Sequence, residues 1–326
     1  MNPAASMNPN GIAPILISVY DRKEHLQRCI EALLLNKEAS QTVLYIVSDG
    51  AKDEDRKRII REIRTYILGI EGFKEVRTRF REENWGMRAS AMDAIAWVFS
   101  EHASLIRMED DIVCSPHYLE FLNQGLQTYR NDERVFCICA HTHPQYKPPA
   151  NYPHDVFLWR SFSPWGFAMW KDRWEDLLEA TEMERKRLDD PTVWKAYCRN
   201  RPILSSRKNY LEGVLHNDAR INLHMFLEDK YAIYPNKALS INSGMDGSGT
   251  HCGLGWTYPK QLLNDAPVQL PGNLEPSRKI HRKLYRLQYS LLNHGVGGML
   301  RSMGCFDTVY AMVRGLFGSA PKRKKA

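Results

Sequence analysis

Hydrophobic residues fall into two alternating kinds of run in the first third of the chain. The run Ile15–Tyr20 is apolar and rich in β-branched residues, as in a strand buried on both faces of a parallel sheet. In residues 24–35 the apolar positions recur instead at helical spacing. A second such pair follows, a strand over Val43–Val47 and a helix over residues 54–68. Two consecutive strand and helix units predict a doubly wound α/β sheet.

Acidic residues follow three of the predicted strands. Asp21 ends the first strand, Asp49 follows the second, and the strand Leu105–Met108 runs into the three acids of Glu109–Asp111. In open α/β sheets, ligands bind in the crevice beyond the carboxyl ends of the strands. We therefore expect these acids to converge on one crevice.

No glycine-rich phosphate loop follows any of these strands. Neither GxGxxG nor GxxxxGK[ST] occurs at these strand ends, so a bound diphosphate would need another source of positive charge. A divalent ion held by Glu109–Asp111 would supply it, because hard oxygen ligands favour Mg or Mn. The alternative is that the three acids form only a solvated turn.

Charge is distributed unevenly along the 326 residues. Residues 277–326 hold eleven Lys and Arg residues against one acid, whereas 34 basic and 37 acidic residues precede them. The body is therefore slightly acidic, and the tail lacks the interleaved aromatics of a nucleic-acid module, so no nucleic-acid partner is expected. The seven scattered cysteines and the start of the chain, which lacks a signal-peptide pattern, predict a cytoplasmic protein.

The segment LIRMEDDIVCSPHYLEFLN, residues 105–123, resembles the metal-binding strand of the GT-A glycosyltransferases. It is most similar to the EDD variant of the DxD motif in N-acetylglucosaminyltransferases that act on N-glycan mannose. The segments PILISVYDRKEHLQRCIEAL and YIVSDG resemble the nucleotide-binding strands of these families, and ENWGMRASAMDAI resembles the helix before the DxD strand. Further on, RSFSPWGFAMWKDRW and IYPNKALSINSGMDGSGTHCG resemble bacterial family-2-like sugar transferases.

This resemblance extends over residues 14–253, with a gap at 180–210, and it implies a role for each matching residue. Arg88 would reach the diphosphate or the base, the alternative being a solvated surface arginine. His251 would complete the metal coordination, the alternative being a structural or exposed histidine. The acids and the tyrosine at the strand ends would bind the donor: Asp111 as the direct Mn or Mg ligand, Glu109 and Asp110 at the ribose or the metal's waters, Asp49 at the uracil imide, and Tyr20 with Asp21 around the base.

A carboxylate base is needed if the reaction inverts the sugar, because the acceptor hydroxyl must lose its proton. Asp218 matches the Asp of a W-D-x-x-W-like segment in similar transferases, although Asn217 replaces the tryptophan here. The competing Asp189 and Asp190 precede a proline, as expected of a helix cap. Inversion is implied by the resemblance alone, since a retaining enzyme can share the other features.

Four of the eight tryptophans lie within residues 157–174. Indole rings stack on apolar sugar faces, so Trp165 and Gly166 are expected beside the acceptor, while Trp170 and Trp174 are expected in the core. The stretch Thr142–Asp155 holds four prolines without periodicity and predicts a long loop.

These features predict four parts of the chain. We expect a disordered N-terminus over residues 1–13, a donor-binding half over 14–143, an acceptor-binding half of the same domain over 144–276, and a basic helical tail over 277–326. The apolar stripe and the cations of that tail favour attachment to the inner face of an anionic membrane, at about 1 kcal/mol per basic residue near the surface. The alternatives are a helix packed on the body and a solvated terminus.

The sequence therefore predicts a metal-dependent glycosyltransferase of GT-A fold, a Rossmann-like doubly wound mixed sheet. It would move a sugar from a nucleotide diphosphate sugar, with UDP as the expected nucleotide, to a hydroxyl of a glycan or lipid-linked glycan. Two alternatives stay open: a sugar-phosphate nucleotidyltransferase, and a glycan-binding scaffold with a decayed site. The missing glycine-rich loop after the first strand disfavours the nucleotidyltransferase.

Overall fold

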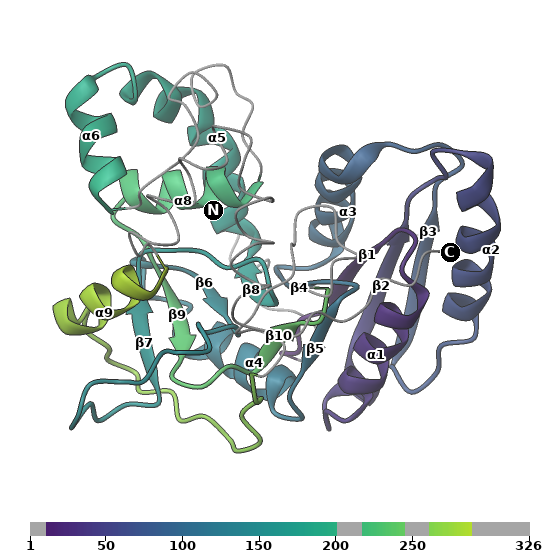
Figure 1. Cartoon of the computed structure of the whole chain (residues 1–326), viewed down its shortest axis with the longest axis horizontal. Coiled ribbons are helices and arrows are strands. Elements are labelled where there is room, and N and C mark those ends of the chain that lie inside the picture. The colour runs from purple at the N-terminus through teal and green to yellow at the C-terminus, as the bar shows by residue number, and fades with distance from the viewer. Residues whose placement is uncertain (1–10, 201–216, 245–260, 289–326) are drawn as a thin grey trace, which may run out of the picture.

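A computed structural model describes residues 11–200, 217–244 and 261–288, which form a mixed β-sheet between two layers of helices (Figure 1). The strands are β1 (Ile15–Val19), β2 (Val43–Ser48), β3 (Glu75–Phe80), β4 (Ser104–Glu109), β5 (Ile112–Cys114), β6 (Val135–Cys139), β7 (Val156–Trp159), β8 (Phe167–Trp170), β9 (Tyr231–Pro235) and β10 (Ser240–Asn242). The helices are α1 (Lys23–Leu34), the short 3-10 helix η2 (Ala39–Gln41), α2 (Glu54–Leu68), α3 (Gly86–Glu101), α4 (Tyr118–Thr128), α5 (Lys171–Arg187), α6 (Pro191–Asn200), α8 (Asn217–Leu227) and α9 (Arg278–Gln288).

The main sheet has eight strands in the order β3-β2-β1-β4-β8-β6-β9-β7. Strands β3, β2, β1 and β4 are parallel, β8 is antiparallel to both of its neighbours, β6 and β9 are parallel, and β7 is antiparallel to β9. A separate two-stranded ribbon pairs β5 with β10. The predicted Rossmann-like, doubly wound mixed sheet is confirmed.

Each face of the sheet is covered by a different set of helices. One core cluster contains buried residues of α1, α2 and α4, and the other contains buried residues of α3, α5, α8 and α9. Representative side chains of the first cluster are Leu26, Ile63 and Leu122, and those of the second are Ile95, Trp174, Ile221 and Ile280. The buried strands explain the continuous apolar runs, because both of their faces are covered.

Several strands end, and several helices begin, at one edge of the sheet. The carboxyl ends of β1, β2, β4 and β6 share this edge, because these strands run the same way. Helix α3 begins there after β3, and antiparallel β8 starts there. Helix α8 also begins at this edge, because its other end leads directly into the amino end of β9. We call this the carboxyl edge.

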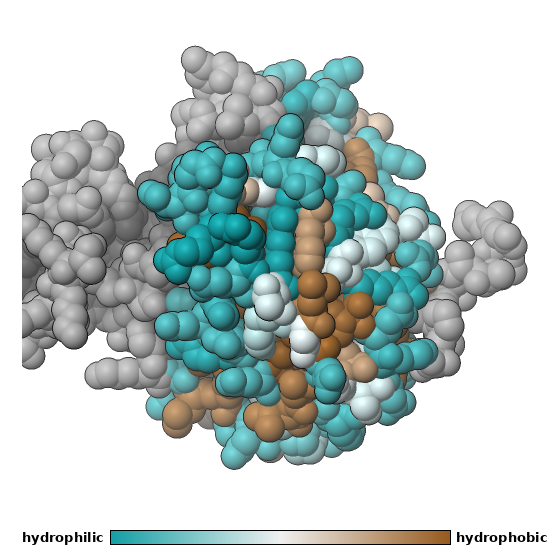
Figure 2. All heavy atoms as spheres, turned by 90° about the vertical axis from the view of Figure 1, so that its right-hand side faces the viewer, coloured by the Kyte–Doolittle hydropathy of each residue, from teal (hydrophilic) through white to brown (hydrophobic). Residues whose placement is uncertain are grey.

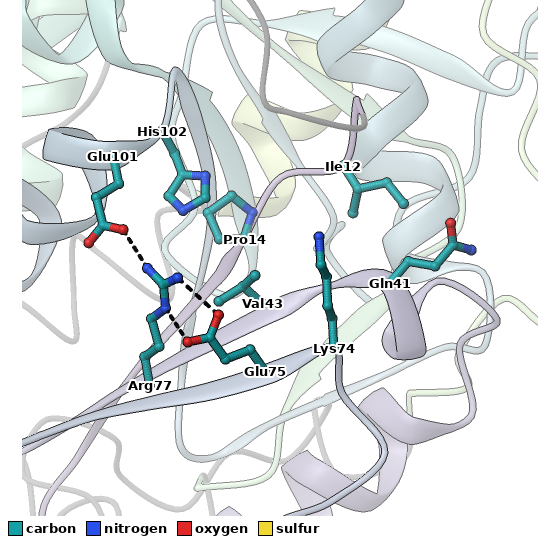
Figure 3. A pocket seen from close by; sticks show the side chains of 9 residues that line it. All are labelled: Ile12, Pro14, Gln41, Val43, Lys74, Glu75, Arg77, Glu101 and His102. Carbon is teal, nitrogen blue, oxygen red and sulfur yellow. Dashed lines mark hydrogen bonds and ion pairs between the residues drawn. The ribbon is translucent and has the colours of Figure 1, made fainter.

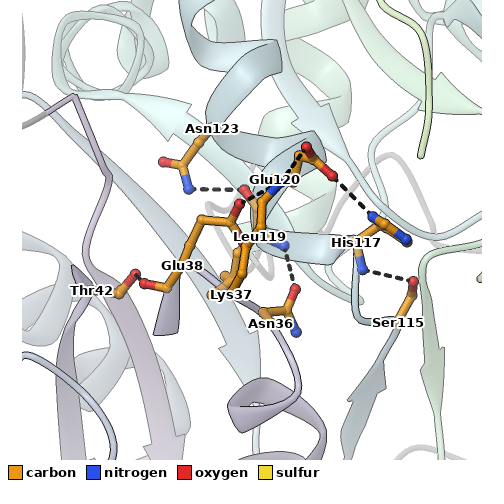
Figure 4. Close-up of polar contacts among 9 residues, drawn as sticks. All are labelled: Asn36, Lys37, Glu38, Thr42, Ser115, His117, Leu119, Glu120 and Asn123. Atoms are coloured by element: carbon orange, nitrogen blue, oxygen red, sulfur yellow. Dashed lines mark hydrogen bonds and ion pairs between the residues drawn. The ribbon is translucent and has the colours of Figure 1, made fainter. Parts of the chain in front are cut away.

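A buried polar junction fixes the segment that follows the three acids (Figure 4). The side-chain oxygen of Asn36, after α1, accepts a hydrogen bond of 2.9 Å from the backbone N–H of Leu119 in α4. That N–H is one of the donors that the first turn of a helix leaves unpaired. Lys37 forms an ion pair of 2.7 Å with Glu120 beside it. The junction ties β5 and α4 to α1 and so holds the acidic turn in place.

Helix α9 packs on the body of the protein. Its Ile280 and Leu284 are buried in the second core cluster and Leu287 packs against it, so the apolar stripe of this helix is used internally. Of the alternatives given above for the basic tail, α9 thus follows the one in which a helix packs on the body of the protein. Five basic residues of α9 point away from the core and are exposed; we call them the basic ridge: Arg278, Lys279, Arg282, Lys283 and Arg286.

The surface around α2 is largely hydrophilic (Figure 2). Apolar side chains do reach the surface at the C-terminal ends of α1 and α2, where Leu34, Leu35 and Leu68 are exposed. Among the helices that the structure describes, none combines the length and the apolar character needed to cross a bilayer.

Candidate active site

The predicted acids at the end of β4 are held by an arginine that follows β1. Arg22 donates to Asp111 Oδ2 through Nη1 at 2.8 Å, and its Nη2 forms an ion pair with Asp110. The side chains of both aspartates are about 95% buried, whereas that of Arg22 is 22% exposed. One guanidinium therefore compensates two buried carboxylates, a pairing that its planar fork of donors suits. The sequence analysis did not identify Arg22.

Burial perturbs the ionisation of this cluster. It raises the pKa of Asp110 to about 7, although the Arg22 charge opposes the shift. Burial also raises the pKa of Glu109, where Arg107 opposes the shift and the charges of Asp111 and Asp218 add to it. Such perturbed carboxylates at a strand end are typical of functional sites.

Asp111 has one carboxylate oxygen left over. Oδ2 is bound by Arg22, but the buried Oδ1 has no hydrogen-bond partner among the residues that the structure describes. The backbone oxygen of Asp111 accepts hydrogen bonds from the N–H and the hydroxyl of Ser243, at 2.8 and 2.9 Å. Leaving a buried polar atom without a partner costs free energy of folding. Oδ1 is therefore suited to bind a cation.

The donor set fits a divalent metal of the kind predicted. Within residues 11–200, 217–244 and 261–288, no group of three Asp, Glu, His or Cys side chains could hold an ion by itself. Magnesium-type sites commonly use only one or two carboxylates and take the other ligands from substrate phosphates and water. Asp111 would be the ligand, as predicted. The predicted ligand His251 lies outside the described residues and stays a prediction.

Asp49 organises the turn that begins α3. Its Oδ1 accepts from the N–H of Trp85 at 3.0 Å and of Gly50 at 3.1 Å, and its Oδ2 accepts from the N–H of Gly86 at 3.0 Å. A carboxylate has about four acceptor positions, so one remains for the predicted bond to a base. The indole of Trp85 is 51% exposed, and the guanidinium of Arg81 lies 3.9 Å from its ring centre. Trp85 is thus an exposed aromatic residue next to Asp49, the residue predicted to bind the base. No sequence pattern indicated Trp85.

Tyr20 and Asp21 lie at the end of β1 and contact the segment before α2. The Tyr20 hydroxyl accepts from the backbone N–H of Lys52 at 3.1 Å, and Asp21 pairs with Arg56 at 3.4 Å. Both predicted residues are half-buried at the carboxyl edge. Their contact with the base stays a prediction.

Asp218 and Arg88 approach the site from two different helices. Asp218 opens α8 at the carboxyl edge and is half-buried, and its Oδ1 accepts from the N–H of Ala219. Its charge contributes to the raised pKa of Glu109, so the two carboxylates lie within electrostatic range. Arg88 is exposed in the first turn of α3 and lowers the pKa of Arg220 in α8, although burial is the larger cause.

Asp190 has the local role that its sequence context predicts. Its Oδ1 accepts from the backbone N–H of Thr192 at 2.7 Å and from the Thr192 hydroxyl at 2.8 Å, at the start of α6. This is a helix cap before a proline, so its geometry calls for no catalytic role.

Trp165 lies at the same edge, half-buried, and its ring packs edge-on against His141 with the ring centres 4.5 Å apart. Burial lowers the pKa of His141 to about 4, so the ring is neutral at pH 7 and donates to the Ser240 carbonyl. Gly166 has φ +85°, and a Cβ there would meet the Tyr118 hydroxyl at 2.7 Å. Backbone geometry thus accounts for this glycine, and the sugar contacts of Trp165 and Gly166 stay predictions.

The second half of the aromatic segment packs as predicted. Met169 is fully buried, and Trp170 and Trp174 are at least 95% buried where β8 turns into α5.

A separate cleft of about 260 Å³ opens at the opposite edge of the sheet, near the amino ends of β2 and β3 (Figure 3). Arg77 closes one side through ion pairs with Glu75 and Glu101. None of the predicted donor or acceptor residues lines it, so this cleft is distinct from the acidic site.

The mixed Rossmann-like sheet, with an acidic cluster beyond the carboxyl ends of its first strands, is of the GT-A type. A family model described as "Glycosyl transferase family 2" matches residues 15–200, more than half of the chain. The chain belongs to glycosyl transferase family 2. The predicted resemblance to the GT-A, family-2-like sugar transferases is thereby confirmed.

Solved structures give weaker similarities. The mannosyltransferase PcManGT from Pyrobaculum calidifontis, solved with GDP-Man and Mn2+, is 10% identical over 51% of this chain and 45% of its own, with a TM-score of 0.36. S. aureus TarS is 13% identical over 52% of this chain and 29% of its own, with a TM-score of 0.34. Residues 1–349 of TarS give 11% identity over 52% and 49%, also at 0.34. The chain thus spans less than half the length of each.

Proposed function

We propose that this chain transfers a sugar from a nucleotide diphosphate sugar, with UDP as the expected nucleotide, to a hydroxyl of a glycan or lipid-linked glycan. The supporting observation is Asp111 Oδ1, which lies in a buried acidic cluster at the carboxyl edge and finds no hydrogen-bond partner in the described part of the chain. Asp49, Tyr20 and Asp21 follow the neighbouring strands and would bind the base. Family 2 membership supports glycosyl transfer as the reaction class.

In the proposed mechanism, Asp111 would hold Mn or Mg through Oδ1, and the ion would neutralise charge on the departing diphosphate. Glu109 and Asp110 would orient the ribose or the waters around that ion. Asp218 would accept the proton of the attacking hydroxyl; its charge adds to the raised pKa of Glu109, which supports a role close to the acids. Trp165, whose carbonyl accepts from the Ser240 hydroxyl of β10, would stack on the acceptor sugar. The proposed outcome is inversion at the anomeric carbon.

Calorimetric titration with UDP and with GDP, each with and without Mn2+, tests this proposal. We expect UDP to bind more tightly with Mn2+ than without it, and GDP to bind more weakly than UDP. Binding of neither nucleotide in the presence of Mn2+ would reject the donor site. Tighter binding of GDP than of UDP would show that the donor carries GDP. It would leave glycosyl transfer as the proposed reaction.

We also propose that the protein works in the cytoplasm on the inner face of an anionic membrane, docked through the basic ridge. The five cations of the ridge are exposed, α9 contains no acid, and none of the five forms an ion pair with another described residue. Because Ile280 and Leu284 are buried in the protein, α9 would bind by charge and not by insertion. Each basic residue close to such a surface contributes about 1 kcal/mol.

Sedimentation with phosphatidylcholine vesicles, with and without phosphatidylglycerol, tests the docking. The wild type should bind only the anionic vesicles, and added salt should release it. The double variant Lys279→Glu and Lys283→Glu should bind at least about tenfold more weakly. The matched control replaces the exposed Lys57 and Arg61 of α2 with glutamate and should bind like the wild type. Equal losses in both variants would show a response to net charge and reject the ridge as the docking surface.

A further inference from the structure

The guanidinium of Arg22 occupies a position between the two aspartates where an external cation would also be attracted. It donates to Asp111 Oδ2 at 2.8 Å and pairs with Asp110, and the side chains of both acids are about 95% buried. A guanidinium keeps its positive charge at any physiological pH. Arg22 is therefore a permanent cation fixed inside the site.

Gly244 closes the other side of this pair. A Cβ at position 244 would lie 2.3 Å from Asp111 Oδ2 and 2.8 Å from Arg22 Nη1, so a larger residue there would displace the paired side chains. The backbone N–H of Gly244 donates to Oδ1 of Asn242 at 2.8 Å. The backbone of Gly244 thus packs directly against the ion pair.

Oδ1 and Oδ2 of Asp111 consequently have different roles. Oδ2 is used by Arg22, and the buried Oδ1 has no partner within residues 11–200, 217–244 and 261–288. An ion that binds alone at Oδ1 would meet the positive guanidinium bound to the same carboxylate. Two positive charges on one carboxylate repel strongly where water is largely excluded.

We propose that Arg22 is a built-in counter-ion of the metal site that makes metal binding depend on the nucleotide. This inference rests on the proposed function of the acids as the donor site. A nucleoside diphosphate carries enough negative charge to compensate both the ion and the arginine. The guanidinium also suits phosphate oxygens, because its donors form paired hydrogen bonds with them. Metal and nucleotide therefore bind as a unit, and each raises the affinity for the other.

Electron paramagnetic resonance of free Mn2+ measures this coupling without any turnover. In the wild type, Mn2+ alone should bind weakly, and UDP should raise its affinity. In the variant Arg22→Gln, Mn2+ alone should bind at least about tenfold more tightly than in the wild type, and the gain from UDP should shrink. Equal or weaker binding of Mn2+ alone by Arg22→Gln would overturn the proposal.

Two further variants make the result decisive. Arg28→Gln removes an exposed arginine from α1, the helix that Arg22 precedes, and should bind Mn2+ like the wild type. Should Arg22→Gln not fold, Arg22→Met replaces it: methionine also removes the positive charge and keeps a long unbranched side chain, so Mn2+ alone should still bind more tightly than in the wild type. An Arg22→Met protein that binds Mn2+ like the wild type would then overturn the proposal.

The outcomes also separate this inference from the proposed function. UDP-dependent binding of Mn2+ that is the same in the wild type and in the Arg22 variants rejects the counter-ion role alone. Absence of Mn2+ and UDP binding in every protein and every combination rejects the donor site, and the counter-ion role with it.

Discussion

Replacing Asp111 with asparagine should abolish the dependence of UDP binding on Mn2+ and slow sugar transfer by at least about a hundredfold. The substitution keeps the shape of the side chain but removes the charge that would hold the ion through Oδ1. A bound ion contributes several kcal/mol to charge stabilisation, and each 1.36 kcal/mol corresponds to about a factor of ten in rate. Calorimetry with UDP and Mn2+, together with the hydrolysis rate of a UDP-sugar, measures both effects.

Asp55→Asn is the matched control, because Asp55 is exposed in the first turn of α2 and lies outside the site. The backbone bonds between Asp111 and Ser243 do not involve the substituted side chain, so thermal unfolding of the Asp111 variant should stay cooperative. Retention of Mn2+-dependent UDP binding by Asp111→Asn would remove this residue from the metal site.

Replacing Asp218 with asparagine should lower the transfer rate by about 10²- to 10⁴-fold while leaving UDP affinity unchanged. This is the range that a positioned general base contributes. Asparagine preserves the hydrogen bond to the N–H of Ala219 but cannot accept the proton of the acceptor hydroxyl. The rate of donor hydrolysis, with water standing in for the acceptor, and calorimetric UDP binding separate the two effects.

Asp190→Asn provides the comparison, since its carboxylate caps α6 through Thr192. It should change stability slightly and the rate little. If Asp218→Asn instead weakened UDP binding and left the bound enzyme active, Asp218 would be a donor ligand and the base would lie elsewhere.

Sequence patterns predicted strands β1, β2 and β4 but not the edge strand β3. The buried strands β1, β2 and β4 are apolar on both faces and easy to recognise. Strand β3 has the sequence EVRTRF and is exposed or half-buried throughout, because it lies at the end of the sheet. A strand with so little burial shows no strong hydrophobic pattern, and only its partner β2 determines its place.

The acids of the site followed from sequence, but their counter-ion did not. Strand ends indicated Asp49 and the acidic cluster, since chain direction places carboxyl ends together. Arg22 directly follows Asp21, yet it reaches two acids almost ninety residues away. Only the burial of Asp110 and Asp111 reveals that a compensating cation is required. Trp85 was not predicted for a related reason: its neighbours depend on how the chain turns between β3 and α3.

The ribbon of β5 and β10 has a kinetic consequence. β5 follows the acidic turn. Ser243, directly after β10, donates to the carbonyl of Asp111, and the Ser240 hydroxyl at the start of β10 donates to the carbonyl of Trp165. One three-residue strand thus links the proposed metal ligand to the proposed acceptor-binding residue. A shift of Asp111 on donor binding would reach Trp165 through this strand, so the proposed function predicts that the donor binds before the acceptor.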